Sequence, residues 1–353
     1  MAEAILKTSR QWRVTGYDGF DSLKFSEEAI PTIGDNEVLV KIHGASLNFR
    51  DIIIPLGKYP FPQKPNVVPG SDGAGTVLAI GKNVTRFQPG DKVVTTLLQR
   101  HIAGSLTPSA ADSSLGGSID GTFRSIGAFD EQGIVKMPEG LSFTEAATLS
   151  CAGVTAWNSL FGQPGRELTP GQWLLTQGTG GVSLFALQFA KAVGARVIAT
   201  TSSNEKAKLL ERIGADHIIN YRETWNWGER AKELTGGVGV DLVVEVAGAA
   251  TMQQSVASLK LDGTMCVVGF VGGDGNGAEV PNLLDPWLKH YAVRGISVGN
   301  RSQMEAMCRA VEANLENLRP IIDSRTFKLE QLKEAYEYLN SGGNVGKVCI
   351  DID

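Results

Sequence analysis

The stretch WLLTQGTGGVSLFALQFAKAVGARVIATT, residues 173–201, decides the fold of this chain. Residues 173–176 form a short apolar run of the kind found in buried parallel strands. Apolar residues then recur at helical spacing, and Gly194 follows where a helix would end. Residues 196–200 form a second apolar run. The stretch therefore predicts a strand, a glycine-rich turn, a helix over 181–192 and a second strand.

The glycine-rich turn is the first candidate binding element. Glycines lack a Cβ atom, so the chain can turn sharply and a ligand can approach its backbone. A helix that begins directly after the turn presents free N–H groups and the positive end of its dipole, which favours a pyrophosphate. The pattern resembles a dinucleotide-binding βαβ unit, with Ser183 in place of the third glycine, although a plain structural turn has the same spacing. We assign to this turn the predicted cofactor-binding residues Gly178, Thr179, Gly180, Gly181 and Val182.

Composition narrows the class of protein. The chain has 353 residues, enough for two domains, and a net charge of −5. No cluster of Lys and Arg overrides that charge, so we expect no nucleic-acid partner and no anionic membrane. No apolar run reaches membrane-spanning length, and the N-terminus lacks a signal-peptide pattern, which predicts a cytoplasmic protein. The four cysteines lie far apart in the sequence, which disfavours disulfides and a zinc knuckle.

The regions on either side of this unit differ in pattern. Residues 1 to about 150 suggest a β-rich domain, with strands expected at 37–43, 77–80 and 92–95. Residues 98–122 are polar and aperiodic and predict a long surface loop. A helix is expected over 145–161, with Ser142 or Thr144 as its cap.

From residue 173 the pattern alternates between strand and helix. Strands are expected at 173–176, 196–200, 217–220, 241–246, 264–269 and 293–298. Helices are expected at 181–192, 204–213, 225–234, 251–260, 302–317 and 329–340, before a last strand at 346–351 that returns to the N-terminal domain. Six strands with intervening helices predict a doubly wound parallel sheet of the α/β class.

An ordered set of further motifs resembles the medium-chain dehydrogenase/reductase superfamily. The motifs are PGSDGAGTV at 69–77, GKNV at 81–84, PGDKVV at 89–94, LSCAGVTA at 149–156 and GKV at 346–348. The resemblance implies a GroES-like catalytic domain formed by residues 1–152 and 300–353. It also implies a Rossmann cofactor-binding domain formed by residues 153–299.

The chain departs from the family pattern at the positions where zinc-dependent members bind their catalytic metal. Zinc members carry Cys, His, Glu and Cys at positions that match Asn48, Ser71, Asp72 and Cys151 here. A catalytic zinc needs three suitable protein ligands. The polar segment 98–122 also replaces the lobe that holds a structural zinc. The resemblance therefore points to the zinc-independent branch, similar to quinone oxidoreductases and enoyl reductases, with no bound metal and with Cys151 as a small buried side chain.

The end of the second strand indicates the form of the cofactor. NAD-specific sites place an acid at this strand tip. Here the tip is polar and is followed by a lysine, which suits a 2′-phosphate. We therefore predict NADPH, bound through Thr201, Ser202, Ser203, Lys206 and, by resemblance, Tyr221. Glu205, one step into the helix, argues against a phosphate there, and Lys206 could instead be a solvated charge.

The remaining cofactor residues follow from the resemblance alone. They are Asn48 near the nicotinamide ribose, Thr155 near the nicotinamide, Ala247, Gly248, Phe270 and Val271 after two later strands, and Asn344 and Lys347 in a C-terminal motif that closes over the cofactor.

Without zinc, hydride transfer needs a proton donor or an oxyanion stabiliser. Tyr59 matches a tyrosine that acts as the acid in related enoyl reductases, although it could instead be a wall of the pocket. Arg50 is the second candidate, or it forms a structural ion pair with Asp51.

The sequence therefore predicts an NADPH-dependent reductase of an α,β-unsaturated carbonyl or a quinone, both small molecules. Reduction of a ketone or aldehyde, or alcohol dehydrogenation, is the first alternative. A non-catalytic NADPH-binding protein is the second. The apolar segment 292–298 predicts an edge strand through which a homodimer forms.

Overall fold

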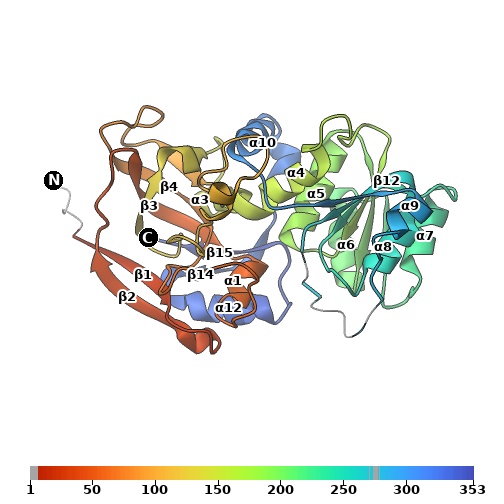
Figure 1. Ribbon diagram of the computed structural model, residues 1–353, viewed down its shortest axis with the longest axis horizontal. Helices are drawn as coiled ribbons and strands as arrows, with labels where there is room; N and C mark the ends of the chain where they lie inside the picture. Colours follow the sequence, from red (N-terminus) through yellow and green to blue (C-terminus); the bar gives the residue numbers. More distant parts are fainter. Residues whose placement is uncertain (1–6, 270, 273–276, 278) are drawn as a thin grey trace. The chain divides into compact units, whose positions relative to one another are not determined.

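The computed structural model describes residues 7–269, 271–272, 277 and 279–353. The chain divides into two compact units (Figure 1). The first unit comprises Met1–Val154, Gly299–Leu315 and Arg319–Asp353, and the second comprises Thr155–Val298 with Glu316–Leu318.

A six-stranded parallel sheet forms the centre of the second unit, in the order β10-β9-β8-β11-β12-β13. Its strands are β8 (Trp173–Gln177), β9 (Arg196–Thr201), β10 (His217–Asn220), β11 (Val240–Glu245), β12 (Leu259–Val267) and β13 (Ala292–Gly295). Numbered from β8 along the chain, the spatial order is 3-2-1-4-5-6. This is the doubly wound Rossmann order, and it confirms the predicted fold class.

Helices in this unit connect consecutive strands of the sheet. They are α5 (Gly181–Ala192), α6 (Asn204–Ile213), α7 (Trp227–Leu234), α8 (Met252–Ser258) and α9 (Asp285–Lys289). Leu175, Ile198 and Val243 carry the apolar face of three neighbouring strands and are fully buried. Trp227 of α7 and Val256 of α8 belong to the same core. This packing holds the carboxyl ends of the strands, where ligands of such sheets bind, in a fixed register.

The predicted bounds of one helix and two strands in this unit are wrong. The helix expected over 251–260 ends at Ser258, and β12 begins at Leu259 rather than at residue 264. Leu259 pairs with Val240 of β11 and is buried, so sheet pairing overrides the local helical pattern. The strand expected over 293–298 ends at Gly295, and Val298 has a left-handed backbone with φ of 49°.

A seven-stranded sheet forms the first unit, in the order β14-β15-β3-β4-β5-β7, with β6 also paired to β3. Its strands are β3 (Glu37–Ser46), β4 (Asp72–Ile80), β5 (Lys92–Thr95), β6 (Ile126–Asp130), β7 (Ile134–Lys136), β14 (Ile322–Lys328) and β15 (Lys347–Asp351). The predicted return of the last strand is confirmed, because β15 pairs with β3. A separate antiparallel pair, β1 (Thr8–Val14) and β2 (Leu23–Ala29), was not predicted.

Helical segments of the first unit range from single turns to the 13-residue helix α10 (Arg301–Ala313). They also include α1 (Phe49–Ile53), α2 (Pro108–Ala111), α3 (Phe143–Ala147) and α12 (Leu332–Asn340), whereas α11 (Leu315–Leu318) belongs mostly to the second unit. The single helix expected over 145–161 is instead α3, a π-helical turn over Leu149–Gly153, and α4 (Val154–Phe161). Ser142 caps α3 through a capping box with Glu145, as one of the two predicted caps.

The segment 98–122 is not a simple surface loop. It contains α2, and its residues 113–117 are buried. The Leu115 carbonyl accepts a hydrogen bond from Arg50 Nη1 at 2.6 Å. A Cβ added to Gly117 would lie 2.8 Å from Arg50 Nη2, so the segment packs closely against that guanidinium. Within the part of the chain that the structure describes, no helix is long and apolar enough to cross a bilayer.

Candidate active site

The glycine-rich turn lies between β8 and α5 and leaves open space above its backbone. Gly178 has a φ of 73°, and a Cβ added to Gly178 or to Gly180 would meet no atom within 4 Å. Gly180 is the N-cap of α5, and no side chain caps that helix. The first-turn N–H groups therefore have no side-chain competitor, and the turn fits the pyrophosphate of a dinucleotide.

Ser183, the departure from the glycine pattern, has a structural role. Its side chain is buried in the first turn of α5, and its Oγ donates a hydrogen bond to the Gln177 carbonyl at 2.6 Å. The hydroxyl ties the beginning of the helix to the end of β8. Where the family pattern has a glycine that allows close packing, this chain therefore has a serine that forms a hydrogen bond.

The ends of β9 and β10 bring together the residues predicted for the 2′-phosphate. Tyr221 N donates to the Thr201 carbonyl at 3.0 Å, because the two parallel strands end at the same edge. Ser203 caps α6, and its Oγ accepts a hydrogen bond from Lys206 N at 3.3 Å. Ser202 lies between these residues in the chain. Glu205 is exposed at the same helix end, where hydrogen bonds from its own backbone and from Ser203 lower its carboxyl pKa.

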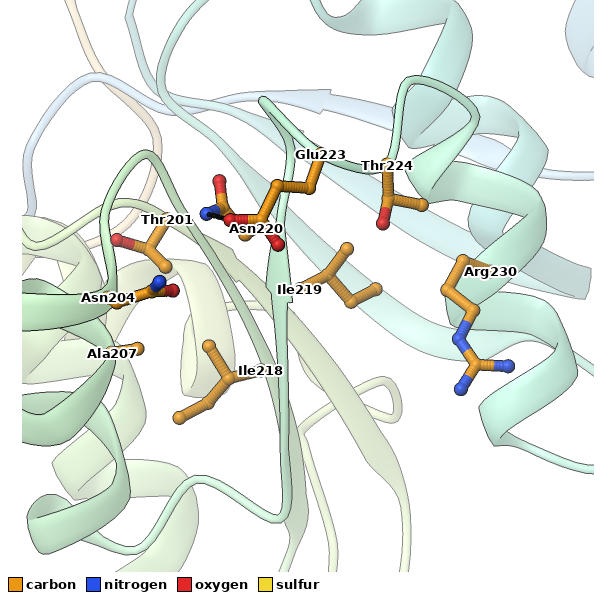
Figure 2. A pocket seen from close by; sticks show the side chains of 9 residues that line it. All are labelled: Thr201, Asn204, Ala207, Ile218, Ile219, Asn220, Glu223, Thr224 and Arg230. Carbon is orange, nitrogen blue, oxygen red and sulfur yellow. Dashed lines mark hydrogen bonds between the residues drawn. The ribbon is translucent and has the colours of Figure 1, made fainter.

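A pocket of about 310 Å³ lies where β9 and β10 end (Figure 2). It is lined by Thr201, Asn204, Ala207, Ile218, Ile219, Asn220, Glu223, Thr224 and Arg230. Thr201 is shared with the predicted cofactor set. Asn220 Nδ2 donates to Glu223 Oε1 at 2.6 Å, so the carboxylate is held at the pocket wall. An anionic group would meet that negative charge inside the pocket.

The loop after β11 contains two predicted cofactor residues whose amides are already engaged. The N–H groups of Ala247 and Gly248 each donate to Glu245 Oε1 at 2.9 Å. Val271 N donates to the Val246 carbonyl at 3.2 Å, so Val271 lies against this loop. Phe270 lies outside the described residues. In the same unit, Thr155 is buried near the beginning of α4.

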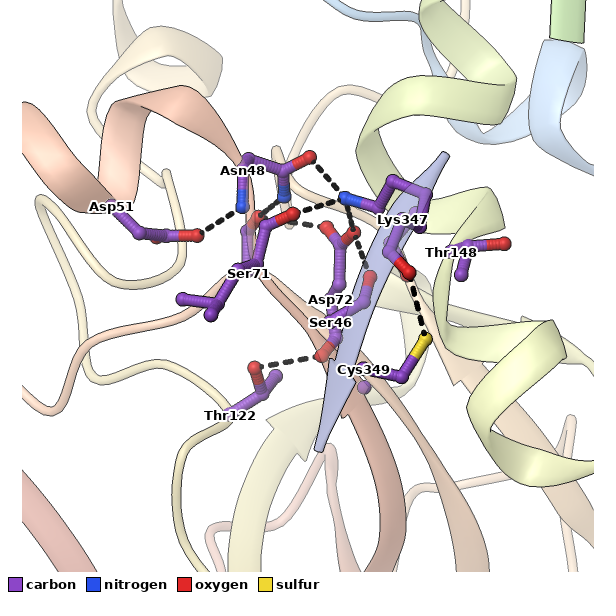
Figure 3. Close-up of polar contacts among 12 residues, drawn as sticks. Ser46, Asn48, Asp51, Ser71, Asp72, Thr122, Thr148, Lys347 and Cys349 are labelled. Carbon is purple, nitrogen blue, oxygen red and sulfur yellow. Dashed lines mark hydrogen bonds and ion pairs between the residues drawn. The ribbon is translucent and has the colours of Figure 1, made fainter. Parts of the chain in front are cut away.

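A buried polar cluster in the first unit brings together Asn48, Ser71 and Asp72, three of the four residues matched to zinc ligands by the family resemblance (Figure 3). The Lys347 ammonium contacts Asp72 Oδ2 at 3.1 Å, Asn48 Oδ1 at 2.5 Å and the Leu47 carbonyl at 2.5 Å. These contacts use all three of its donors, and Lys347 is 3% exposed. Its predicted contact with the cofactor stays a prediction. Asn344 donates to the Gly346 carbonyl at 3.0 Å in the turn before it.

The ammonium also fixes the orientation of the Asn48 amide. Lysine can only donate, so Oδ1 of Asn48 must face it, and Nδ2 donates to Ser71 Oγ at 3.3 Å. Ser71 Oγ in turn donates to Asp72 Oδ1 at 2.9 Å, and Ser46 Oγ donates to Asp72 Oδ2 at 2.7 Å. The amide is therefore locked, with its N–H groups turned away from Lys347.

These residues do not fit a zinc ion. Asn48 and Ser71 offer neutral oxygen atoms, and the Lys347 cation already binds two oxygen atoms of the group. Burial, and then Asp72, raise the pKa of the Cys151 thiol to about 12, whereas a zinc ligand must be a thiolate. No group of three or more His, Cys, Asp and Glu side chains suited to a metal occurs among the described residues.

The two predicted catalytic residues lie together in the first unit. Arg50 Nε donates to the Tyr59 phenol oxygen at 3.2 Å, and the guanidinium carbon lies 5.1 Å from the centre of the Tyr59 ring. Arg50 is buried, and Tyr59 is half-buried. Asp51 Oδ2 accepts from the Asn48 backbone N–H at 2.8 Å rather than from Arg50, so no direct Arg50–Asp51 ion pair forms. A cation thus supports the phenol oxygen.

Three site residues were missed by the sequence analysis. Gln177 and Glu245 are the last residues of two apolar strands. Asp72 is the first residue of β4 and forms an ion pair with Lys347. A polar residue at the end of an apolar strand was the available signal for the first two. The pairing of Asp72 with Lys347 joins residues far apart in the chain, so no local pattern could reveal it.

Comparison with known proteins accounts for both units. The sequence profile described as the alcohol dehydrogenase GroES-like domain matches residues 34–139, and that described as zinc-binding dehydrogenase matches residues 181–313. The chain is 44% identical to a zinc-type alcohol dehydrogenase-like protein of Schizosaccharomyces pombe, over 95% of this chain and 96% of that protein. It is 32% identical to an alcohol dehydrogenase of Rhizobium meliloti, with 94% and 96% covered.

A solved structure gives the same result. The quinone oxidoreductase of Escherichia coli complexed with NADPH is 25% identical to this chain and has a TM-score of 0.80. The match covers 97% of this chain and 99% of that one. The chain therefore belongs to the medium-chain dehydrogenase/reductase superfamily of oxidoreductases.

Proposed function

We propose that this oxidoreductase is a zinc-independent, NADPH-dependent reductase of α,β-unsaturated carbonyl compounds or quinones. One observation carries the proposal: the Arg50 guanidinium donates a hydrogen bond to the Tyr59 phenol oxygen, in a unit where the Lys347 ammonium already binds the Asn48 and Asp72 oxygen atoms. Such a site offers a proton donor in place of a Lewis acid. Names of relatives in this superfamily include quinone oxidoreductases, which supports the substrate class.

The proposed chemistry adds one hydride and one proton to the substrate. NADPH, when bound, supplies the hydride, to the β-carbon of an enone or to a quinone. The Tyr59 phenol gives the proton to the oxygen or carbon of the developing enolate, or to the oxygen of the developing quinol. The phenolate that remains lies beside the Arg50 guanidinium, whose Nε–H already donates to that oxygen. A Tyr59→Phe variant should then lose about 100-fold or more of kcat.

The proposed cofactor site is built chiefly from predicted residues of the second unit. The open turn at Gly178–Val182 would hold the pyrophosphate, and Thr201, Ser202, Ser203, Lys206 and Tyr221 would hold the 2′-phosphate. The relative solved with NADPH supports this form of the cofactor. A Lys206→Ala variant should weaken NADPH binding more than NADH binding. Equal binding of the two cofactors by the unchanged protein would contradict the preference.

The experiment that tests the function is NADPH oxidation with a metal chelator present. The panel contains quinones, 2-enals, 2-enones and saturated ketones, with each product identified. Turnover of enals or quinones, lost in Tyr59→Phe and kept in the exposed control Tyr17→Phe, is the expected result. Loss of all activity with the chelator would refute zinc independence.

A carbonyl reductase or alcohol dehydrogenase is the second candidate. It is favoured by the names of the 44% and 32% identical relatives, which are both described as alcohol dehydrogenases or similar to them. Turnover of ketones alone in the same panel would select this candidate. NADPH binding without any turnover would select a non-catalytic binding protein.

We also propose a homodimer formed through β13, in a cytoplasmic protein. The strand is at the edge of the parallel sheet, and Val293 is 50% exposed on it. Trp287 and Leu288 of the preceding helix are exposed as well. An apolar edge strand invites pairing with a second copy. The four cysteines are free, which agrees with a reducing compartment.

A further inference from the structure

A buried carboxylate at the end of β11 has no role in the proposed chemistry. Glu245 is 0% exposed and forms no ion pair within the described ranges. It accepts five hydrogen bonds instead. The donors are Gln177 Nε2 (2.7 Å), Ser255 Oγ (2.5 Å), Thr251 Oγ1 (2.7 Å), and the amides of Ala247 and Gly248 (2.9 Å each). Such a charge is tolerated in the interior because every lone pair meets a donor.

Gln177 completes this cluster from the end of β8. Its Nε2 donates to Glu245 and, at 2.9 Å, to Ser255 Oγ. Its Oε1 accepts from the amides of Val246 at 3.0 Å and Ala247 at 3.3 Å. Its backbone carbonyl accepts the Ser183 hydroxyl of α5. One residue therefore touches both the glycine-rich turn and the loop after β11.

We propose that Gln177 and Glu245 form a positioning pair that sets the β11–α8 loop, residues 246–251, for nucleotide binding. The three consecutive amides of Val246, Ala247 and Gly248 all point to the pair, so the loop backbone follows its geometry. The inference rests on the proposed function for the identity of the nucleotide, NADPH. Neither side chain has to touch the nucleotide for the pair to act.

The logic of donors and acceptors makes this pair testable. In Glu245→Gln, the new side-chain NH₂ group would face the NH₂ group of Gln177. Two hydrogen-bond donors would then point at each other. If Gln177 turned over to avoid this, its NH₂ group would face the amides of Val246 and Ala247. Either arrangement leaves a conflict. In the exchanged double variant Gln177→Glu/Glu245→Gln, the new carboxylate at position 177 accepts from both loop amides. The new side-chain amide at position 245 donates to that carboxylate, so the conflict disappears.

The experiment combines hydrogen exchange with nucleotide binding. Amide exchange of residues 246–251 should rise about tenfold or more in Glu245→Gln, and NADPH affinity should fall about tenfold to hundredfold. Both should return toward the original values in the exchanged double variant. The matched control is Asp241→Asn at the opposite end of β11, where Asp241 accepts from Trp173 N at 2.7 Å. A loss of stability there should leave loop exchange and NADPH affinity unchanged.

Several results would overturn the inference. The first is unchanged amide exchange of the loop in Glu245→Gln. The second is an equal loss of NADPH affinity in Asp241→Asn. The third is no recovery in the exchanged double variant, provided that circular dichroism shows this variant to be folded. If the unaltered protein did not bind NADPH, the proposed function would fail. The exchange data would still decide whether the pair orders the loop.

Discussion

Asp51 carries a carboxyl group into the interior of the first unit without a full set of partners. Its Oδ2 accepts a hydrogen bond from the backbone N–H of Asn48, and its Oδ1 has no hydrogen-bond partner within the described part of the chain. Burial raises the pKa of Asp51 to about 6, although the charge of Arg50 opposes the shift. In the unfolded chain the value would be about 3.9. The carboxyl therefore favours folding most when it is protonated.

An Asp51→Asn variant should remove this pH dependence. Because the folded pKa is raised, the contribution of Asp51 is full below about pH 4 and is lost as the pH rises through about 6. Above that pH the ionised form costs roughly 2–3 kcal/mol of the free energy of unfolding. The difference in stability between variant and parent, measured by urea unfolding from pH 4.5 to 8, should move in favour of the variant as the pH rises. A difference that stays constant over this range would contradict the expectation.

The cysteines should be unreactive in the folded protein. Burial raises the pKa of Cys151, Cys308 and Cys349 to about 12 and that of Cys266 to about 11. Thiolates are the nucleophiles, so at pH 8 the reactive fraction is very small. Iodoacetamide at pH 8 should label none of them natively and all four in denaturant, as counted by mass spectrometry. Rapid native labelling of any one would show that its surroundings open.

At the scale of elements, the pairing of β3 with β4 depends on close backbone approach. A Cβ added to Gly75 would lie 2.0 Å from the Lys41 carbonyl oxygen. The backbones cannot separate without breaking the register Ile42↔Gly75. We expect Gly75→Ala to cost about 2–3 kcal/mol of stability. Gly34→Ala is the control, since its Cβ would meet the flexible Glu37 side chain at 3.2 Å; equal thermal shifts in both variants would refute the steric explanation.

Elements of the second unit were predictable where local patterns and packing agree. The bounds of α5 and α6 follow from helical periodicity and their caps, and β10 follows from its apolar run. The beginning of β12 was not predictable, because Leu259 joins the sheet through a neighbour 19 residues earlier. The buried part of 98–122 was missed for a similar reason. This part of the segment is held in place by the contact between Arg50 and Gly117, which are neighbours only in the folded chain.

The candidate site was predictable to a different degree in its two halves. The glycine turn carries a local signal, whereas Tyr59 was named from the family resemblance and Arg50 as a separate candidate; the structure places these two side chains in contact. The cluster around Lys347 depends on strands β15 and β3 becoming neighbours. Sequence spacing does not encode the direction in which a buried ammonium points. The partners of Lys347 could therefore be found only in the folded molecule.

At the scale of the whole molecule, a dimer through β13 predicts a mutational effect on assembly. Val293→Glu places a charge on the exposed edge, so it should convert the protein to monomers without unfolding it. Sedimentation velocity at micromolar concentration is the measurement. Val238→Glu, at another exposed valine outside β13, should leave the assembly unchanged. A monomeric parent protein would contradict the proposal.

The position of β15 between β14 and β3 has a consequence for biosynthesis. Residues 155–298 form their sheet from one continuous segment and can fold as soon as they have left the ribosome. Strand β3 gains its neighbour β15 only after residues 347–351 have been made, and Asp72 gains its ion pair with Lys347 from the same segment. The second unit can therefore complete its sheet before the first unit does, although the first unit begins earlier in the chain. A nascent chain stalled before residue 347 would hold a finished Rossmann domain beside an incomplete β-rich partner.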